Sequence, residues 1–263
     1  MFEDVRYKLY QGDCLEVMDK LIEEGVEVDL TVTSPPYDDL RNYNNTLVWN
    51  FDVFKQVADR LYKITKNGGV VVWVVNDKTK NGSETGSSFK QALYFKEIGF
   101  NLHDTMIYAK NNPMPNVNSK RYMQSFEYMF VLSKGKPKTF NPIMEKSKYG
   151  GEFTFGEPST WNKDGELIKK ERRKINEYKK VSNIFYYTVG STVNKHIKHP
   201  ALFPEKLAED QILSWSNEDD LILDCFMGAN TTGKMALLNN RNYIGIEKVE
   251  EYFEIGKKRI ENL

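Results

Sequence analysis

Apolar residues recur along the chain with two different periods, and their order predicts an α/β fold. Val28, Leu30 and Val32 alternate with other residues as in a strand. Residues 69–75 form a continuous, mostly β-branched apolar run, typical of a central parallel strand that is buried on both faces. Residues 51–64 have the period of an amphipathic helix, which Asn67-Gly68-Gly69 is expected to end.

The remaining pattern continues this alternation of strands and helices. Further strands are expected at 7–11, 104–109, 126–132, 221–224 and 243–247, and further helices at 15–22, 89–98, 232–239 and 249–260. Such an order favours a mostly parallel, doubly wound sheet. In sheets of this class, ligands bind at the carboxyl ends of the strands.

The composition is that of a folded protein from a reducing compartment. The 263 residues, 40% hydrophobic and 28% charged, suffice for one sizeable domain and exclude disorder as the main state. Two cysteines, Cys14 and Cys225, provide neither a disulfide framework nor four zinc ligands. No apolar run reaches the roughly 18–20 residues of a membrane helix, and no signal peptide precedes the first strand. We therefore expect a cytoplasmic protein without a membrane partner or a bound metal.

Positive charge is concentrated in one stretch, although the formal net charge is zero. Residues 134–180 hold thirteen Lys/Arg and seven Asp/Glu, a net of +6, and are rich in Gly, Pro, Ser and Asn. A basic run within this stretch contains Lys169, Lys170, Arg172, Arg173 and Lys174. On charge alone, a solvated surface insertion and an electropositive arm for nucleic-acid phosphates explain the pattern equally well.

The segment from Asp224 to Gly233 has features of a cofactor-binding turn. It joins a predicted strand to a predicted helix, and its small residues allow the backbone to approach a ligand beside the free N–H groups of the helix. Glu247 ends the next strand, where an acid is placed to bind a ribose diol. The pattern indicates a nucleoside-containing cofactor, with a tight turn beside a surface acid as the alternative. No Gly-Lys-Ser/Thr sequence is present, which excludes a P-loop.

A second candidate segment, Thr33-Ser34-Pro35-Pro36-Tyr37, ends an apolar strand. Its two prolines fix φ and remove two N–H donors, so nearby carbonyls are left to accept hydrogen bonds. The Ser34 hydroxyl and a proline carbonyl together suit the N–H groups of an amine, and Tyr37 offers a flat face for stacking. A stiff loop without chemistry is the plain alternative, which the position after a strand disfavours.

These segments resemble the motifs of the S-adenosylmethionine-dependent DNA amino-methyltransferases, which methylate an exocyclic amine of cytosine or adenine. Residues 33–37 resemble the catalytic motif IV, 224–228 the cofactor motif I, Glu247 the acid of motif II, 12–14 motif III, 199–207 motif X and 125–132 motif VIII. The order, with motif IV before motif I and motif X just ahead of motif I, is similar to the β-type permutation of this family. The resemblance covers nearly the whole chain except roughly residues 136–190.

The resemblance implies a Rossmann-like, circularly permuted fold with S-adenosyl-L-methionine as cofactor and double-stranded DNA as substrate. It divides the chain into a catalytic half at 1–135, a basic target-recognition region at 136–190 and a cofactor-binding half at 191–263. The cofactor residues that it implies are Asp13, Cys14, Pro204, Lys206, Asp224, Phe226, Gly228, Asn230, Thr231, Thr232 and Glu247. The basic run at 169–174 and Arg41 are expected to contact DNA, although a surface role fits Arg41 equally well.

The mechanism implied is direct methyl transfer to an extruded base, with Ser34, Pro35, Pro36 and Tyr37 as the catalytic residues. Ser at the first position of motif IV favours the N4 of cytosine, with the N6 of adenine as the alternative. Carbon-5 methylation is disfavoured because it needs a cysteine nucleophile, typically after a proline, and neither cysteine follows one.

One departure from the family pattern leaves alternatives open. Asn230 stands where the family usually has a glycine; asparagine tolerates a positive φ, but its side chain can crowd the cofactor. A catalytically silent nucleic-acid-binding relative therefore remains conceivable, as does an RNA or protein-glutamine methyltransferase. A partner restriction endonuclease, and a monomeric or homodimeric state, are both left open.

Overall fold

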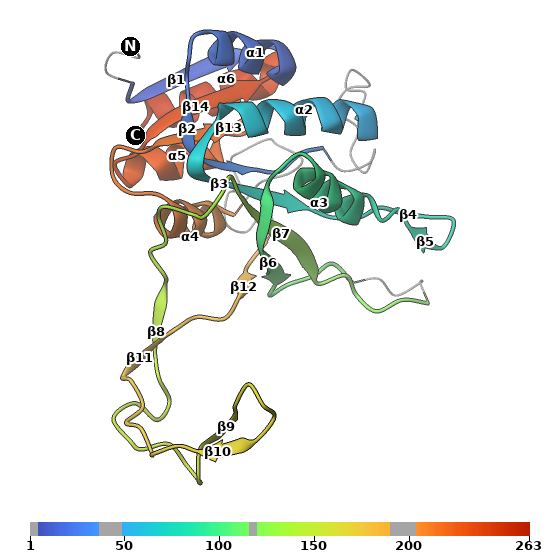
Figure 1. Cartoon of the computed structure of the whole chain (residues 1–263). Helices are drawn as coiled ribbons and strands as arrows, with labels where there is room; N and C mark the ends of the chain where they lie inside the picture. Colours follow the sequence, from blue (N-terminus) through green and yellow to red (C-terminus); the bar gives the residue numbers. More distant parts are fainter. Residues whose placement is uncertain (1–4, 37–48, 116–119, 190–203) are drawn as a thin grey trace. The chain divides into compact units, whose positions relative to one another are not determined.

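The computed structural model describes residues 5–36, 49–115, 120–189 and 204–263 (Figure 1). The chain forms two compact units, a larger one of Met1–Asn141 with Asn183–Leu263 and a smaller one of Pro142–Ser182. The smaller unit lies inside the stretch expected as the target-recognition region. It is narrower than that stretch, because residues on both sides of it belong to the larger unit.

An eight-stranded sheet forms the centre of the larger unit. Its strands are β1 (Tyr7–Gln11), β2 (Val28–Thr33), β3 (Thr65–Val75), β6 (Asn101–Lys110), β7 (Phe126–Ser133), β12 (Ile184–Tyr187), β13 (Leu221–Asp224) and β14 (Asn242–Glu247). The spatial order is β1-β14-β13-β2-β3-β7-β6-β12, and β7 alone in this sheet runs antiparallel to its neighbours. The mostly parallel, doubly wound sheet expected from the sequence is confirmed.

Helices cover both faces of this sheet (Figure 1). They are α1 (Cys14–Glu23), α2 (Phe51–Ile64), α3 (Ser87–Glu97), α4 (Glu205–Trp215), α5 (Thr231–Leu238) and α6 (Glu250–Glu261). The buried side chains of α1, α2 and α3 belong to one core cluster, and those of α4, α5 and α6 belong to another. In β3, Val71, Trp73 and Val75 join the first cluster, whereas Val70, Val72 and Val74 join the second. The burial of this strand on both faces is therefore confirmed.

The strand β3 begins earlier than the sequence pattern predicts. Asn67-Gly68-Gly69 was expected to end the helix, but these residues lie within β3, which starts directly after α2. The N–H of Gly68, at φ +83°, donates to the Lys134 carbonyl at 2.6 Å. A Cβ on Gly69 would lie 2.9 Å from the Lys66 carbonyl oxygen. The two glycines therefore permit close backbone contacts inside the strand and do not act only as a helix stop.

Sequence patterns did not indicate β12, which lies in the stretch 136–190 and yet joins the main sheet beside β6, nor the short strands in two further places. In the larger unit, β4 (Thr79–Lys80) and β5 (Ser83–Glu84) form a hairpin after β3. In the smaller unit, β8 (Met144–Lys146) pairs with β11 (Tyr178–Lys180), and β9 (Ser159–Trp161) pairs with β10 (Leu167–Lys169). Ser147 is the one buried residue of this smaller unit, so main-chain pairing rather than an apolar core gives it form. Within the described ranges, no helix is long and apolar enough to cross a membrane.

Trp73 supports a prediction about stability. Its side chain is 0% exposed, and its Nε1 donates to Gln91 Oε1 at 2.8 Å. Trp73→Ala is expected to lower the free energy of unfolding by about 3–5 kcal/mol, because it leaves a cavity between α2, α3 and the sheet. Trp161→Ala is the matched control, since this side chain in the smaller unit is 70% exposed. Urea unfolding followed by circular dichroism measures both, and similar effects of the two substitutions would contradict this account of the core.

Candidate active site

The carboxyl ends of β2 and β13 are neighbours near the centre of the sheet. From β13 the chain continues through α5 to β14 on one side, and from β2 it continues through α2 to β3 on the other. Ligand sites of open α/β sheets form where the winding reverses in this way. The two candidate segments found in the sequence follow these two strands, so the fold brings them to one place.

A buried hydrogen bond joins the two segments. Thr33 Oγ1 donates to Asp224 Oδ1 at 2.7 Å, and the N–H of Phe226 donates to the same oxygen at 3.1 Å. Close by, Thr232 Oγ1 donates to the Val32 carbonyl at 3.2 Å. Burial raises the pKa of Asp224 to about 6, even though the donors around it favour the ionised form. The end of β2 and the turn after β13 are thus held together through one desolvated carboxyl group.

The proline segment follows directly from this contact. Ser34, Pro35 and Pro36 come after the last residue of β2, with Pro35 buried and its two neighbours half-buried. They therefore lie at the switch point of the sheet. Tyr37 and Arg41, which were expected to contact the base and the DNA, lie outside the described residues.

The turn after β13 has a left-handed backbone at two positions. Gly228 has φ +48°, and Asn230 has φ +60° and ψ +44°. Asn230 therefore adopts a positive φ, which asparagine tolerates. Its side chain is fully buried, and its Nδ2 donates to the Gly256 carbonyl in α6 at 3.2 Å. Asn230 thus ties the turn to α6, and its predicted contact with the cofactor stays a prediction.

Glu247 binds the same turn from the end of β14. Its Oε2 accepts from the N–H of Gly228 at 2.8 Å, and its Oε1 accepts from the N–H of Val249 at 2.8 Å. Burial raises the pKa of this carboxyl group above its ordinary value, although the backbone donors act in the opposite direction. A carboxylate has about four acceptor positions, so Glu247 can also accept from two hydroxyl groups of a ribose.

The residues after β1 lie beside Glu247. The N–H of Gly12 donates to the Glu247 carbonyl at 2.9 Å. Asp13 accepts from the N–H of Leu15 at 2.9 Å, which caps α1, and its second oxygen pairs with Lys248 Nζ at 3.0 Å. Burial acts to raise the pKa of Asp13, but these partners hold it below its ordinary value. At the carboxyl ends of β1 and β14, the pKa of Asp13 is thus lowered and that of the nearby Glu247 is raised.

Burial favours the protonated thiol at both cysteines. Burial raises the pKa of Cys14 to about 12, and burial also raises the pKa of Cys225. A nucleophilic cysteine needs a lowered pKa or an adjacent base. These thiols therefore agree with the expectation that carbon-5 chemistry is disfavoured.

Of the predicted motif X residues, Pro204 and Lys206 begin α4. Pro204 is the N-cap, and Lys206 Nζ pairs with Asp210 Oδ1 at 2.5 Å and with Glu209 Oε2 at 3.1 Å. Tyr187 at the end of β12 donates to the other oxygen of Asp210 at 2.9 Å. Lys206 thus binds carboxylates of its own helix, and residues 199–203 lie outside the described residues.

Sequence patterns missed Arg259, which fastens the turn together with Glu205 of the motif X segment. Arg259 Nη1 donates to the Ala229 carbonyl and to Thr231 Oγ1, both at 2.9 Å. Its Nη2 pairs with Glu205 Oε1 at 2.5 Å, and Lys234 Nζ donates to the same oxygen at 2.8 Å. These contacts join α4, α5 and α6 around the turn. No motif indicated Arg259, because it belongs to an ordinary amphipathic helix pattern and finds its partners only in the fold.

Comparisons with known proteins agree with this arrangement. A family model described as DNA methylase, for N6 and N4 enzymes, matches residues 28–258. The orphan methyltransferase M.BamHII of Bacillus amyloliquefaciens is 54% identical over 242 residues, which cover 89% of each chain. The type II methyltransferase M.HinfI of Haemophilus influenzae is 29% identical over 97% of this chain and 68% of its own.

The chain belongs to the N6/N4 DNA methylase family. A solved complex of M1.HpyAVI with S-adenosylmethionine is similar, with a TM-score of 0.64 and 26% identity over 96% of this chain and 99% of that one. The cytosine-N4-specific PvuII DNA methyltransferase has a TM-score of 0.68 at 22% identity, over 97% and 86% of the two chains, a likeness in fold. The Rossmann-like fold expected from the sequence is thus confirmed.

This methyltransferase uses S-adenosyl-L-methionine, and its residues fit that cofactor. Glu247 lies beside the turn and retains acceptor positions for a ribose. Gly228 has no Cβ, so it adopts its positive φ without strain and leaves the backbone of the turn open to a ligand at this point. The cofactor supplies an electrophilic methyl group, and the chain supplies the acceptors and the backbone that position it.

In the smaller unit, the side chains of Lys169 and Arg172 in the basic run contact residues of the same unit. Lys169 Nζ pairs with Glu157 Oε2 at 2.6 Å, and Arg172 Nε donates to the Gly156 carbonyl at 3.1 Å. All five basic residues of the run are exposed. The charge predicted to meet DNA is therefore presented to solvent.

Asp224 supports a prediction about pH. Its pKa in the folded chain is raised from 3.8 to about 6, so between these values the folded chain holds a proton that the unfolded chain has released. Stability is therefore greater below this window and falls as the pH rises through it, by on the order of 2–3 kcal/mol. Asp224→Asn is expected to reduce this fall, and the raised pKa of Glu247 leaves part of it in place.

Urea unfolding at pH 4 and pH 7 measures this effect. Asp13→Asn is the control, because the pKa of Asp13 is lowered and the group titrates below the window, so this variant keeps the full fall. An unchanged pH dependence in Asp224→Asn would show that this carboxyl group is not the desolvated group that the contacts indicate.

Proposed function

We propose that this methyltransferase transfers a methyl group from S-adenosyl-L-methionine to the N4 amine of a cytosine extruded from double-stranded DNA. The observation that carries the proposal is the position of Ser34-Pro35-Pro36 after β2, joined through Thr33 and Asp224 to the turn after β13. A hydroxyl and a carbonyl at this place suit an amine with two N–H groups.

In this proposal, the two acceptors act on the nitrogen of the base. The amine donates one hydrogen bond to Ser34 Oγ and one to the Pro35 carbonyl, which favours a pyramidal nitrogen with a localised lone pair. That lone pair forms the bond to the methyl carbon as the carbon–sulfur bond breaks and S-adenosylhomocysteine leaves, and the nitrogen then releases a proton to water. Holding the reacting atoms in line provides much of the rate enhancement.

Extrusion of the base costs a few kcal/mol, which contacts with the protein must offset. We assign this stacking role to Tyr37, which follows Pro36 in the sequence. We assign residues 1–135 to base binding and chemistry, residues 191–263 to cofactor binding, and the basic residues within 136–190 to recognition of the DNA. The exposure of the run at 169–174 supports the last assignment.

Mass spectrometry of nucleosides tests the chemistry. Unmethylated DNA incubated with the protein and the cofactor is expected to yield N4-methylcytosine. Ser34→Ala is expected to lower the rate by about a hundredfold, because the amine loses one of the groups that position it. The affinity for the cofactor, measured by calorimetry on the same variant, should stay near the wild-type value.

The products decide among the alternatives. N6-methyladenine would keep the site and overturn cytosine as its substrate. A Ser34→Ala variant as active as the wild type would exclude Ser34 from the positioning of the base. Cofactor binding without any methylated DNA would contradict the proposed reaction on DNA.

Titration with salt tests the DNA contact of the smaller unit. Replacing Lys170, Arg173 and Lys174 with Ala is expected to weaken DNA binding and to reduce the slope of log K against log[salt] by about 0.9 for each phosphate that the variant no longer neutralises. The control replaces three exposed lysines on helices of the larger unit, Lys63, Lys96 and Lys258, and so changes the net charge equally. Equal effects of the two triple variants would show that net charge, and not this run, determines the affinity.

A further inference from the structure

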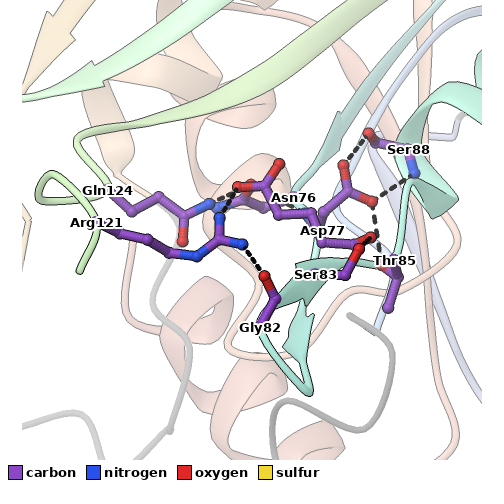
Figure 2. A network of polar contacts seen from close by, with 9 residues as sticks. Asn76, Asp77, Gly82, Ser83, Thr85, Ser88, Arg121 and Gln124 are labelled. Atoms are coloured by element: carbon purple, nitrogen blue, oxygen red, sulfur yellow. Dashed lines mark hydrogen bonds and ion pairs between the residues drawn. The ribbon is translucent and has the colours of Figure 1, made fainter. Parts of the chain in front are cut away.

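A buried carboxylate fixes the hairpin that follows β3 to the start of α3 (Figure 2). Asp77 is 4% exposed, and its Oδ1 accepts from the N–H of Ser88 at 3.0 Å, from Ser87 Oγ at 3.1 Å and from Thr85 Oγ1 at 3.2 Å. Its Oδ2 accepts from Ser88 Oγ. The N-cap residue of α3 is Gly86, which has no side chain to cap the helix. Asp77 therefore caps α3 from outside the helix and closes the base of the hairpin.

The segment before β7 is fastened at two points, to this hairpin and to Asn76 just before it (Figure 2). Gln124 Nε2 donates to Asn76 Oδ1 at 3.0 Å, and the N–H of Asp77 donates to the same oxygen at 2.9 Å. Arg121 Nη1 pairs with Glu84 Oε1 at 3.3 Å, and its Nη2 donates to the Gly82 carbonyl. Arg121 is thus held by the hairpin, and Gln124 is held by Asn76, which lies just before it.

The two residues between these anchors present large apolar side chains to solvent. Tyr122 is 100% exposed, and Met123 is 52% exposed. Lys120, two residues before Tyr122, and Lys80 in the hairpin are also exposed. Tyr122 and Met123 are neighbours on a fastened backbone, so their exposed apolar side chains are together available to a partner. An aromatic ring flanked by basic residues fits nucleic acid, because bases stack on the ring and phosphates pair with the cations.

Tyr122 and Met123 lie at the same end of the sheet as the candidate catalytic residues, the end where β2 and β3 finish. Asn76 follows β3, whose Trp73 pairs in register with Thr33 of the parallel strand β2. β7 runs antiparallel to β3 and starts at Phe126, so Gln124 lies at that same edge. The hairpin and residues 120–124 therefore leave the sheet on the side where Ser34 follows β2.

We propose that Tyr122, with Met123 beside it, enters the DNA duplex next to the base that is being methylated and occupies the space which that base leaves. The proposal rests on the proposed function, since it needs a base that leaves the stack. Apolar side chains that enter between base steps are a recurrent means of holding a duplex open. The hydrogen bonds at Arg121 and Gln124 order the segment in advance, which lowers the entropy cost of insertion. Lys120 and Lys80 pair with the flanking phosphates.

Equilibrium binding to DNA with S-adenosylhomocysteine present tests this role. Tyr122→Ala is expected to lower the affinity for an intact duplex by about tenfold, the value of one base stacked on an aromatic ring, and Tyr122→Trp should retain it. Tyr7→Ala is the matched control, because Tyr7 is also exposed but is the first residue of β1, at the amino ends of the parallel strands. It should bind like the wild type. Thermal melting establishes that each variant is folded.

A duplex with an abasic position opposite the target base distinguishes insertion from simple contact. The tenfold loss in Tyr122→Ala is expected to shrink on this opened duplex, since less stacking has to be replaced. Wild-type affinity of Tyr122→Ala for the intact duplex would overturn the proposal, as would an equal loss on both duplexes and on single strands.

If the wild type binds DNA but transfers no methyl group, the proposed function fails. The binding comparison between Tyr122→Ala and Tyr7→Ala on the intact duplex then still decides whether Tyr122 contacts DNA.

Discussion

The hydrogen bond between Thr33 and Asp224 joins residues that are 191 positions apart, and the candidate site depends on it. One partner ends the strand before the proline segment, and the other ends the strand before the cofactor-like turn. Because the carboxyl group is buried, its charge is costly and its pKa rises. The donors around it define where the two segments meet. Base and cofactor must come together at such a junction if a methyl group is to pass directly between them.

Four carboxylates at the carboxyl ends of the strands play the same structural role. Asp13, Asp77, Asp224 and Glu247 each lie at the end of a parallel strand or two residues beyond it, and each accepts a main-chain N–H from the segment that follows. A carboxylate in this position satisfies a donor that has no partner within the next helix or turn. The loops are therefore held firmly where they leave the sheet, and chemistry is placed just beyond their bases.

Much of the fold could be predicted because it follows from local patterns. The run at 69–75 is apolar on both faces, and it lies in the central strand with core clusters on each side. The places of Ser34 and Asp224 at strand ends follow from the apolar residues before them. The residues that fasten the site could not be found in this way. Arg259 and Asp77 act through partners that the fold supplies, and nothing in their neighbouring sequence distinguishes them from surface charges.

A crystal structure of the protein with S-adenosyl-L-methionine tests the central claim most directly. We expect the cofactor at the carboxyl ends of β13 and β14, with its ribose on Glu247 and its methyl group directed toward Ser34 and Pro35. A cofactor bound at another edge, or with its methyl group directed away from the proline segment, would contradict the proposed transfer. The first result would make the junction of Thr33 and Asp224 the place where the methyl group is transferred.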